Sequence, residues 1–207
     1  NLPGPEVRQG ELDELCRRLD SVPDPACLLL GGSLPIGTPC EIYERLTASF
    51  KARGVRVFLD ADGDPLRCGI RAKPYLIKPN EFEVADLVGE RLRALEEYVE
   101  AAEKLAGQAA EVVVISLGEQ GAIAANGKRV LRVRSPHVEP RSAVGAGDSM
   151  LGAMALSLSR GDSLENALCW GAAAGAAAVI TPGTELCRPE DVRRLLPQVQ
   201  VEELKRK

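Results

Sequence analysis

The segment Gly145-Ala146-Gly147-Asp148 has the residue types that phosphoryl transfer needs. It lies between a Pro/Ser/Arg-rich loop and a long apolar stretch, whose helix is expected to start near Asp148. The start of a helix exposes unpaired N–H groups, and small residues let an anion approach them. Asp148 could accept the proton of an attacking hydroxyl while the neighbouring amides stabilise the transferred group. The alternative is a glycine-rich loop followed by an acidic helix N-cap.

Two better-known phosphate-binding motifs do not fit the sequence. In the dinucleotide fingerprint G-x-G-x-x-G, the last glycine would fall on Met150, and the segment follows a loop after a hairpin. The only Gly-Lys pair, Gly127-Lys128, is followed by Arg129 instead of Ser or Thr, so there is no Walker A loop. A Rossmann dehydrogenase and a P-loop kinase are therefore disfavoured.

Metal and hydrolase chemistry are also disfavoured. Asp60, Asp62 and Asp64 resemble the first ligands of a calcium loop, but Pro65 takes the place of its glycine. We interpret these aspartates as a solvated turn after a strand. His137 is the only histidine and is expected at the surface, which leaves no imidazole for a Cys-His or Ser-His-Asp mechanism. The six cysteines are spread singly and are expected to be reduced and mostly structural: Cys16, Cys27, Cys40, Cys68, Cys169 and Cys187.

Short apolar runs alternate with helical patterns along the first half of the chain. The runs predict buried strands at 26–30, 55–59, 75–77 and 112–116. The helical patterns predict helices at 11–19, 39–53 and 81–105, the last with a break at Gly89. This alternation predicts a parallel sheet covered by helices.

The second half begins with a hairpin pattern. Ala122–Ala125 and Val130–Val133 flank Asn126-Gly127, a favoured turn sequence, and the chain is expected to be helical almost continuously from Gly147 to Ile180. No repeat, low-complexity tract or linker divides the sequence. Residues 1–207 are therefore expected to form a single domain of the α/β class.

Composition favours a small-molecule partner. The 207 residues are 45% hydrophobic and 27% charged, and the net charge of -4 gives no general attraction for nucleic acid or a membrane. The longest apolar stretch, 171–180, is about half of the ~20 residues that a membrane span needs, and predicts a buried helix. Residues 1–10 have no secretory signal pattern, so a cytoplasmic location is expected.

Four segments in order resemble the PfkB family of sugar kinases. Residues 142–153, which include Gly145 to Asp148, are similar to the family's C-terminal signature. The others are Gly32-Ser33-Leu34-Pro35, residues 77–83 and residues 116–121. The resemblance implies a ribokinase-like three-layer αβα fold with a mainly parallel central sheet. It is greatest to the branch that holds 1-phosphofructokinase, tagatose-6-phosphate kinase and the minor 6-phosphofructokinase.

The resemblance implies roles for the matching residues. Asp148 would be the catalytic base, and Gly145, Ala146 and Gly147 would form the anion hole. ATP and Mg2+ would be the cofactors. Lys78 would lie beside the phosphates. Asn80 and Glu83 would form the N-x-x-E motif that organises magnesium and the triphosphate, with Glu83 at the metal.

Further matches place a loop at the nucleotide and a serine at the sugar. Ser116, Gly118 and Gly121 would border the nucleotide, and Ser33 would lie near the sugar phosphate. Each motif also has a simpler interpretation when taken alone. Residues 80–83 could be a helix N-cap with an acidic first turn, residues 116–118 a strand end, and residues 32–35 a turn.

The sequence departs from the family pattern at two places. Ala143 replaces the usual Thr or Ser of the signature. Residues 1–5 resemble the returning lid strand of a full-length member, so the N-terminal third, with the first strands, most of the lid and most sugar contacts, is expected to be missing. The remaining sheet would then have an open edge.

The resemblance implies ATP-dependent phosphorylation of a sugar phosphate. Fructose 1-phosphate, fructose 6-phosphate and tagatose 6-phosphate remain equally open as acceptors. The alternative function is that of a truncated, non-catalytic relative that binds nucleotide. A homodimer is possible, since family members often dimerise through the lid.

Overall fold

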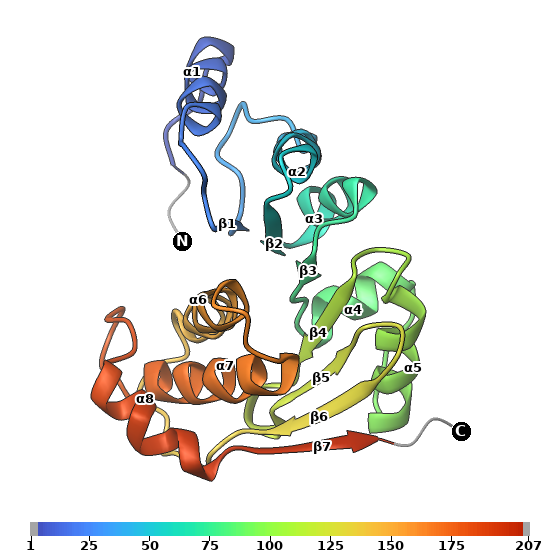
Figure 1. Cartoon of the computed structure of the whole chain (residues 1–207), viewed down its shortest axis with the longest axis vertical. Coiled ribbons are helices and arrows are strands. Elements are labelled where there is room, and N and C mark those ends of the chain that lie inside the picture. The colour runs from blue at the N-terminus through green and yellow to red at the C-terminus, as the bar shows by residue number, and fades with distance from the viewer. Residues whose placement is uncertain (1–3, 205–207) are drawn as a thin grey trace.

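Seven strands form one sheet in the computed structural model, which describes residues 4–204 (Figure 1). In sheet order, the strands are β1 (Cys27–Gly31), β2 (Arg56–Asp60), β3 (Leu76–Ile77), β4 (Val112–Ser116), β5 (Ala122–Ala125), β6 (Val130–Arg134) and β7 (Gln200–Leu204). Strands β1 to β4 are parallel, whereas β5, β6 and β7 each run antiparallel to the preceding strand. The predicted βαβ half therefore continues into an antiparallel half.

Helices cover both faces of the sheet. They are α1 (Gln9–Asp20), α2 (Ile42–Ala52), α3 (Gly63–Gly69), α4 (Glu81–Val88), α5 (Leu95–Leu105), α6 (Ala146–Ser159), α7 (Leu164–Val179) and α8 (Pro189–Leu195). One buried cluster joins α2 to α5 with one face of the sheet, and a second joins α6 and α7 with the other. Helix α8 packs on α7 (Figure 1). The predicted three-layer fold is confirmed.

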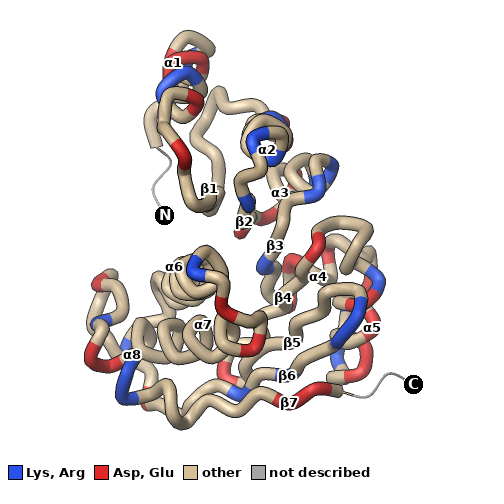
Figure 2. The backbone as a smooth tube through the Cα atoms, viewed as in Figure 1, with Lys and Arg blue, Asp and Glu red and all other residues tan. Residues whose placement is uncertain are grey.

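Apolar sequence explains why the sheet and the α6–α7 layer are buried. The first four residues of β4 are fully buried, as expected for a strand covered on both faces. Helix α7 has Glu165 as its one charged residue, and most of this layer is uncharged in Figure 2. A Cβ atom on Gly171 would lie 2.6 Å from Cγ of Met154, so glycine permits the close approach of α7 to α6.

The turns follow local side-chain chemistry. Helix α4 ends at Gly89, whose φ is +80°, so the predicted break is confirmed at that residue. A second break, which the sequence analysis did not place, separates α6 from α7, and Ser163 Oγ accepts a hydrogen bond from Asn166 N at 3.2 Å. In the confirmed β5–β6 hairpin, Asn126 Oδ1 accepts from Arg129 N at 2.9 Å. Helices α3 and α8 and strand β7 were not predicted, and α3 begins within the segment that was interpreted as a turn.

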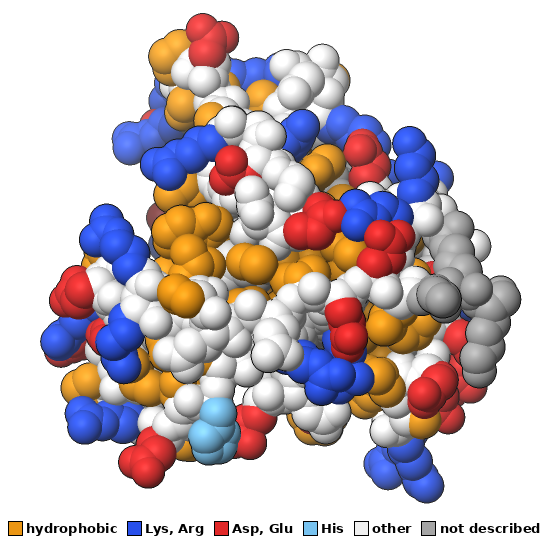
Figure 3. Space-filling view, turned by 60° about the horizontal axis from the view of Figure 1, so that its bottom comes forward, with side chains coloured by type: hydrophobic (Ala, Val, Ile, Leu, Met, Phe, Trp, Pro, Cys, Tyr) orange, Lys and Arg blue, Asp and Glu red, His pale blue; other side chains and the backbone are white. Residues whose placement is uncertain are grey.

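The surface mixes charges of both signs. Basic and acidic side chains are interspersed on the face shown in Figure 3, and the exposed His137 lies there too, as predicted. Within residues 4–204, every helix is too short or too polar to cross a lipid bilayer.

Candidate active site

Polar residues gather where the four parallel strands end. Asp60 is the last residue of β2, Ser116 is the last of β4, and Lys78 directly follows β3. Ser33 lies two residues after β1. Because parallel strands present their carboxyl ends at one edge, these residues belong to the edge at which open α/β sheets bind ligands.

Lys78 and Asp60 form the most buried ion pair of the described residues. Lys78 Nζ lies 2.9 Å from Asp60 Oδ2, and the two side chains are 4% and 16% exposed. Burial raises the pKa of the Asp60 carboxyl, the Lys78 ammonium opposes that rise, and the Asp148 carboxylate adds to it. Asp148 therefore lies within electrostatic reach of the pair.

The interpretation of the aspartate cluster as a solvated turn is wrong for Asp60. Asp62 and Asp64 are exposed, as predicted, but Asp60 is drawn inward by Lys78. Sequence reasoning missed this residue, although its position directly after a buried parallel strand could have indicated it.

The start of α6 faces this ion pair. A Cβ atom on Gly147 would lie 3.2 Å from Lys78 Nζ and 3.6 Å from Asp60 Oδ2, so this glycine lies in close contact with the ion pair. Gly145 has a φ of +76°, and no side chain caps the helix. Asp148 is exposed in the first turn, whereas Ser149 Oγ is buried without a hydrogen-bond partner among the described residues. Ala146 N donates a long hydrogen bond to Ala143 O at 3.5 Å, so the amides that the turn offers to an anion beside the cation are mainly those of Gly145 and Gly147.

Asn80 and Glu83 form a complete capping box at the start of α4. Asn80 Oδ1 accepts from the N–H groups of Phe82 and Glu83, at 2.9 and 3.0 Å. In return, Glu83 Oε2 accepts from Asn80 N at 2.8 Å, and Glu83 Oε1 accepts from Asn80 Nδ2 at 2.7 Å. The helix-capping interpretation of these residues is therefore confirmed.

The charges of Asp60 and Lys78 act on the Glu83 carboxyl, which places Glu83 close to the buried ion pair. Burial raises the pKa of its carboxyl, the hydrogen bond from Asn80 lowers it, and the Asp60 carboxylate raises it further. Capping and ligand binding are compatible, because each carboxylate oxygen has a second lone pair.

The loop after β4 lies directly beside the start of α4. Ser116 N donates to Pro79 O at 3.0 Å, and Ser116 and Asn80 form a parallel bridge. Gly118 and Gly121 have φ values of +56° and +90°. A Cβ atom on Gly121 would overlap the carbonyl oxygen of Val133, so packing against β6 already requires this glycine.

The loop after β1 is tied to β2. Gly32 N donates to Asp60 O at 2.9 Å, and Ser33 is exposed. Tyr43 Oη donates to Gly31 O and Gly32 O, both at 3.0 Å. Sequence reasoning missed Tyr43, which holds the backbone just before Ser33.

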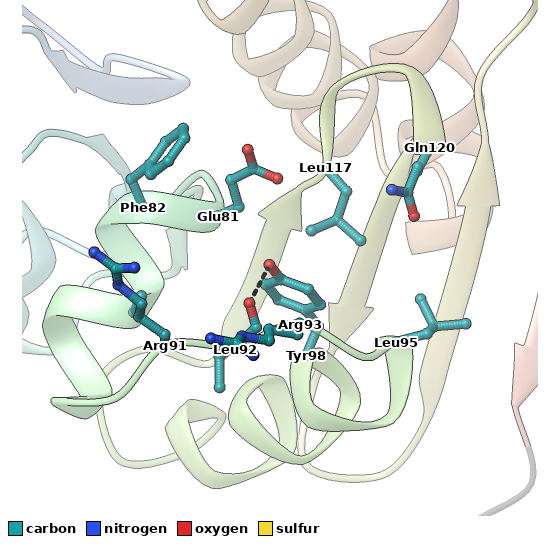
Figure 4. Close-up of a pocket in the computed structure, with 10 residues that line it drawn as sticks. Glu81, Phe82, Arg91, Leu92, Arg93, Leu95, Tyr98, Leu117 and Gln120 are labelled. Carbon is teal, nitrogen blue, oxygen red and sulfur yellow. Dashed lines mark hydrogen bonds between the residues drawn. The ribbon is translucent and has the colours of Figure 1, made fainter.

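A cavity of about 560 Å³ adjoins the site on the side of α5 (Figure 4). It touches both segments that the sequence analysis expects near the nucleotide, through Glu81 of α4 and through Leu117 and Gln120 of the β4–β5 loop. Tyr98 Oη, on its wall, donates to Leu92 O at 3.0 Å. Neither Lys78 nor Asp148 lines this cavity.

Comparison with known proteins identifies relatives across nearly the whole chain. Residues 7–191 match the family described as pfkB family carbohydrate kinase. The chain is 34% identical to the ATP-dependent 6-phosphofructokinase isozyme 2 of Escherichia coli, covering 94% of this chain and 63% of that protein. It is 30% identical to the 1-phosphofructokinase of Borreliella burgdorferi, covering 99% and 66% respectively.

Structural comparison agrees with the sequence comparison. The tetrameric inhibited form of E. coli phosphofructokinase-2 superimposes with a TM-score of 0.88 at 32% identity, covering 96% of this chain and 64% of that one. The chain thus spans a little under two thirds of the length of these relatives.

Proposed function

Since the chain belongs to the pfkB family of carbohydrate kinases, we propose that it is the nucleotide-binding and catalytic part of an ATP-dependent sugar-phosphate kinase. One observation carries this proposal: the uncapped start of α6, with Asp148 in its first turn, faces the buried Lys78–Asp60 pair. Free amides, a buried cation and a carboxylate are the groups that phosphoryl transfer uses.

Each group has a separate task in this proposal. Asp148 accepts the proton of the attacking sugar hydroxyl, and the amides of Gly145, Ala146 and Gly147 stabilise the transferred phosphoryl group. Lys78 binds the phosphates, and Asp60 keeps its ammonium in place.

Residues of the strand-end loops would position the two substrates. Ser116, Gly118 and Gly121 border the nucleotide in this proposal. Ser33, held next to β2 through Gly32, contacts the sugar phosphate.

The acidic residues around Asn80 fit magnesium. Asp60 and Asp62 both raise the pKa of Glu83, so three carboxylates are close enough to repel one another. A divalent cation would relieve that repulsion, and oxygen ligands are those that Mg2+ prefers. Glu83 would hold the ion, oriented by Asn80, and bound Mg2+ would neutralise charge on the triphosphate.

The sugar phosphate is proposed at the level of a class. The two relatives are named 6-phosphofructokinase and 1-phosphofructokinase. Fructose 6-phosphate, fructose 1-phosphate and tagatose 6-phosphate all belong to this class of acceptor. A homodimer is proposed too, and the E. coli relative forms a tetramer in its inhibited state. The second candidate function is a non-catalytic relative that binds nucleotide.

Asp148→Asn in the complete enzyme tests the proposal. Asn keeps the size of the side chain but cannot take the proton, so kcat should fall by about 10² to 10⁴ while the KM for ATP changes little. Asp64→Asn, an exposed carboxylate on α3, is the control and should keep full turnover. If Asp148→Asn retains more than about a tenth of kcat, Asp148 is not the base.

Calorimetry with Mg-ATP separates the two candidate functions. Binding to the folded protein without turnover of any of the three sugar phosphates by the complete protein would favour the non-catalytic relative. Absence of binding at millimolar Mg-ATP would contradict both.

A further inference from the structure

Two cysteines that are 28 positions apart in sequence meet near the active-site edge. Cys40 Sγ and Cys68 Sγ lie 2.7 Å apart. Cys40 lies two residues before α2, on the segment that leads from Ser33, and Cys68 lies in α3, which follows Asp60. The sequence analysis treated the six cysteines as isolated, but the packing of α2 on α3 brings this pair together.

Close packing surrounds Cys68, the inner member of the pair. A Cβ atom on Gly69 would lie 2.5 Å from Leu59 Cδ2 and 3.3 Å from Tyr43 Cβ, so α3 packs closely on β2 and α2 beside Cys68. Cys68 is 4% exposed, whereas Cys40 is partly exposed. A small reagent can therefore reach the Cys40 sulfur more easily than the buried Cys68 sulfur.

No other described cysteine has such a neighbour. Cys16 Sγ accepts a hydrogen bond from Arg45 at 2.8 Å, and Cys27, Cys169 and Cys187 have no thiol partner within residues 4–204. These four cysteines provide an internal comparison in the same protein.

We propose that Cys40 and Cys68 are a modification site, at which a small-molecule disulfide such as oxidised glutathione produces a reversible protein disulfide. The Cys40 thiolate attacks one sulfur of the small disulfide, whose S–S bond breaks and releases one glutathione thiolate. The Cys68 thiolate then attacks the Cys40 sulfur and displaces the second glutathione thiolate. Two cysteine thiols are oxidised, one small disulfide is reduced, and the two protons pass to the released thiolates.

A metal site explains the same atoms less well. Glu41 is the third group near the two sulfur atoms, and its side chain is exposed. A structural zinc site needs four ligands, and no fourth His, Cys, Asp or Glu joins this group among the described residues. A disulfide needs only the two sulfur atoms.

The thiol pair also predicts the order of the reaction. A hydrogen bond to Cys68, then burial, then the neighbouring Glu41 raise the pKa of the Cys40 thiol to about 12. The second step is fast, since the two sulfur atoms already touch. The mixed disulfide on Cys40 should not accumulate in the unaltered protein.

Mass spectrometry after incubation with oxidised glutathione tests the proposal. The expected result is a peptide pair cross-linked between Cys40 and Cys68, reversed by dithiothreitol, with the other four cysteines not cross-linked. In Cys68→Ser, glutathione should remain attached to Cys40, and the control Cys169→Ser should still form the cross-link. The oxidised protein should unfold at a higher temperature than the reduced one, because the link closes a long loop.

Three results would overturn the proposal. The first is glutathione that stays on Cys40 in the unaltered protein, as it does in Cys68→Ser. The second is a Cys40–Cys68 pair that remains reduced while one of the other, partly exposed cysteines reacts. The third is stoichiometric zinc on the purified protein that Cys40→Ser removes.

Discussion

Lys78 and Asp60 depend on each other because both are withdrawn from water. Removing one partner of a buried pair leaves an uncompensated charge, which typically costs about 3 to 5 kcal/mol. We therefore expect Lys78→Met to lower the free energy of unfolding by about that amount at neutral pH, measured by urea denaturation. The matched control is Arg134→Met, which breaks the exposed pair with Glu202 and should cost at most about 1 kcal/mol.

The pH dependence of this stability loss tests whether the unpaired Asp60 carboxylate causes it. In the folded protein, the pKa of Asp60 is raised above its usual 3.8. At pH values between 3.8 and this raised pKa, the folded state binds more protons than the unfolded state. The contribution of Asp60 to stability therefore falls as the pH rises through that window. Without Lys78, the group that opposes this rise is gone, and the window extends to higher pH. The deficit of Lys78→Met should thus shrink in acid, and Asp60→Asn in the same chain should recover part of it. A deficit equal to that of Arg134→Met would contradict this account.

Glu83 combines a structural and a proposed metal-organising task, and the two can be separated. Gln at this position can still accept the hydrogen bond from Asn80 N and loses only the one from Asn80 Nδ2, so Glu83→Gln should change the free energy of unfolding by about 1 kcal/mol. It removes a charge that burial already disfavours. We expect a higher magnesium concentration for half-maximal ATP binding, measured by titration.

The neighbouring Glu81→Gln is the control for Glu83→Gln. Glu81 is in the same first turn but outside the capping box, so its replacement removes the same charge from the helix start. An unchanged magnesium requirement in Glu83→Gln, or an equal change in Glu81→Gln, would leave Glu83 with the capping role alone.

At the scale of elements, the β4–β5 loop is shaped by contact with β6. Gly121→Ala would require both a φ of +90° and overlap with the Val133 carbonyl, whereas Gly127→Ala requires only a φ of +74° in open space. The conformation alone costs about 1 to 2 kcal/mol, so Gly127→Ala should lose about that much and Gly121→Ala several kcal/mol. Urea denaturation measures both. Equal losses would mean that β6 yields and that the contact does not fix the loop.

The elements that could be predicted from sequence have strong local patterns. Residues 112–115 are a β-branched run bounded by Glu111 and Ser116, and Asn126-Gly127 fixes the hairpin by its own side chain and conformation. Strand β7 could not be predicted, because its exposed residues obtain their structure from pairing with β6, far away in sequence. Local pattern determines the first two elements, and tertiary contact determines the third.

The residues of the candidate site also fall into those predictable from a local motif and those determined by tertiary contact. Gly145 to Asp148 and Asn80 to Glu83 were identified because short motifs contain their chemistry. Asp60, Tyr43 and the Cys40–Cys68 pair were missed because each depends on a partner that packing supplies: Lys78, the carbonyls after β1, and the α2–α3 contact, respectively. For Tyr43 and the cysteine pair, no pattern within a few residues contains that information, whereas the position of Asp60 after a buried strand was a signal that we did not use.

The whole molecule has its two helical layers on the faces of the sheet, which leaves β1 and β7 as the ends of the strand order (Figure 1). β7 is mostly exposed and carries Glu202 and Glu203, which discourage edge pairing. β1 is an uncharged run, Cys27–Gly31, in which Leu29 is 42% exposed. Its outer edge has no strand partner within residues 4–204.

An uncharged, partly apolar edge strand is a template for pairing with another chain. We therefore expect the 207-residue chain to self-associate as its concentration rises, and Leu29→Lys to weaken that association at least about tenfold, or about 1.4 kcal/mol. Sedimentation velocity over a concentration series measures this. Leu186→Lys is the control, because Leu186 is 65% exposed but lies between α7 and α8, away from both edges. A chain that stays monomeric throughout, or an equal effect of Leu186→Lys, would show that the β1 edge does not pair.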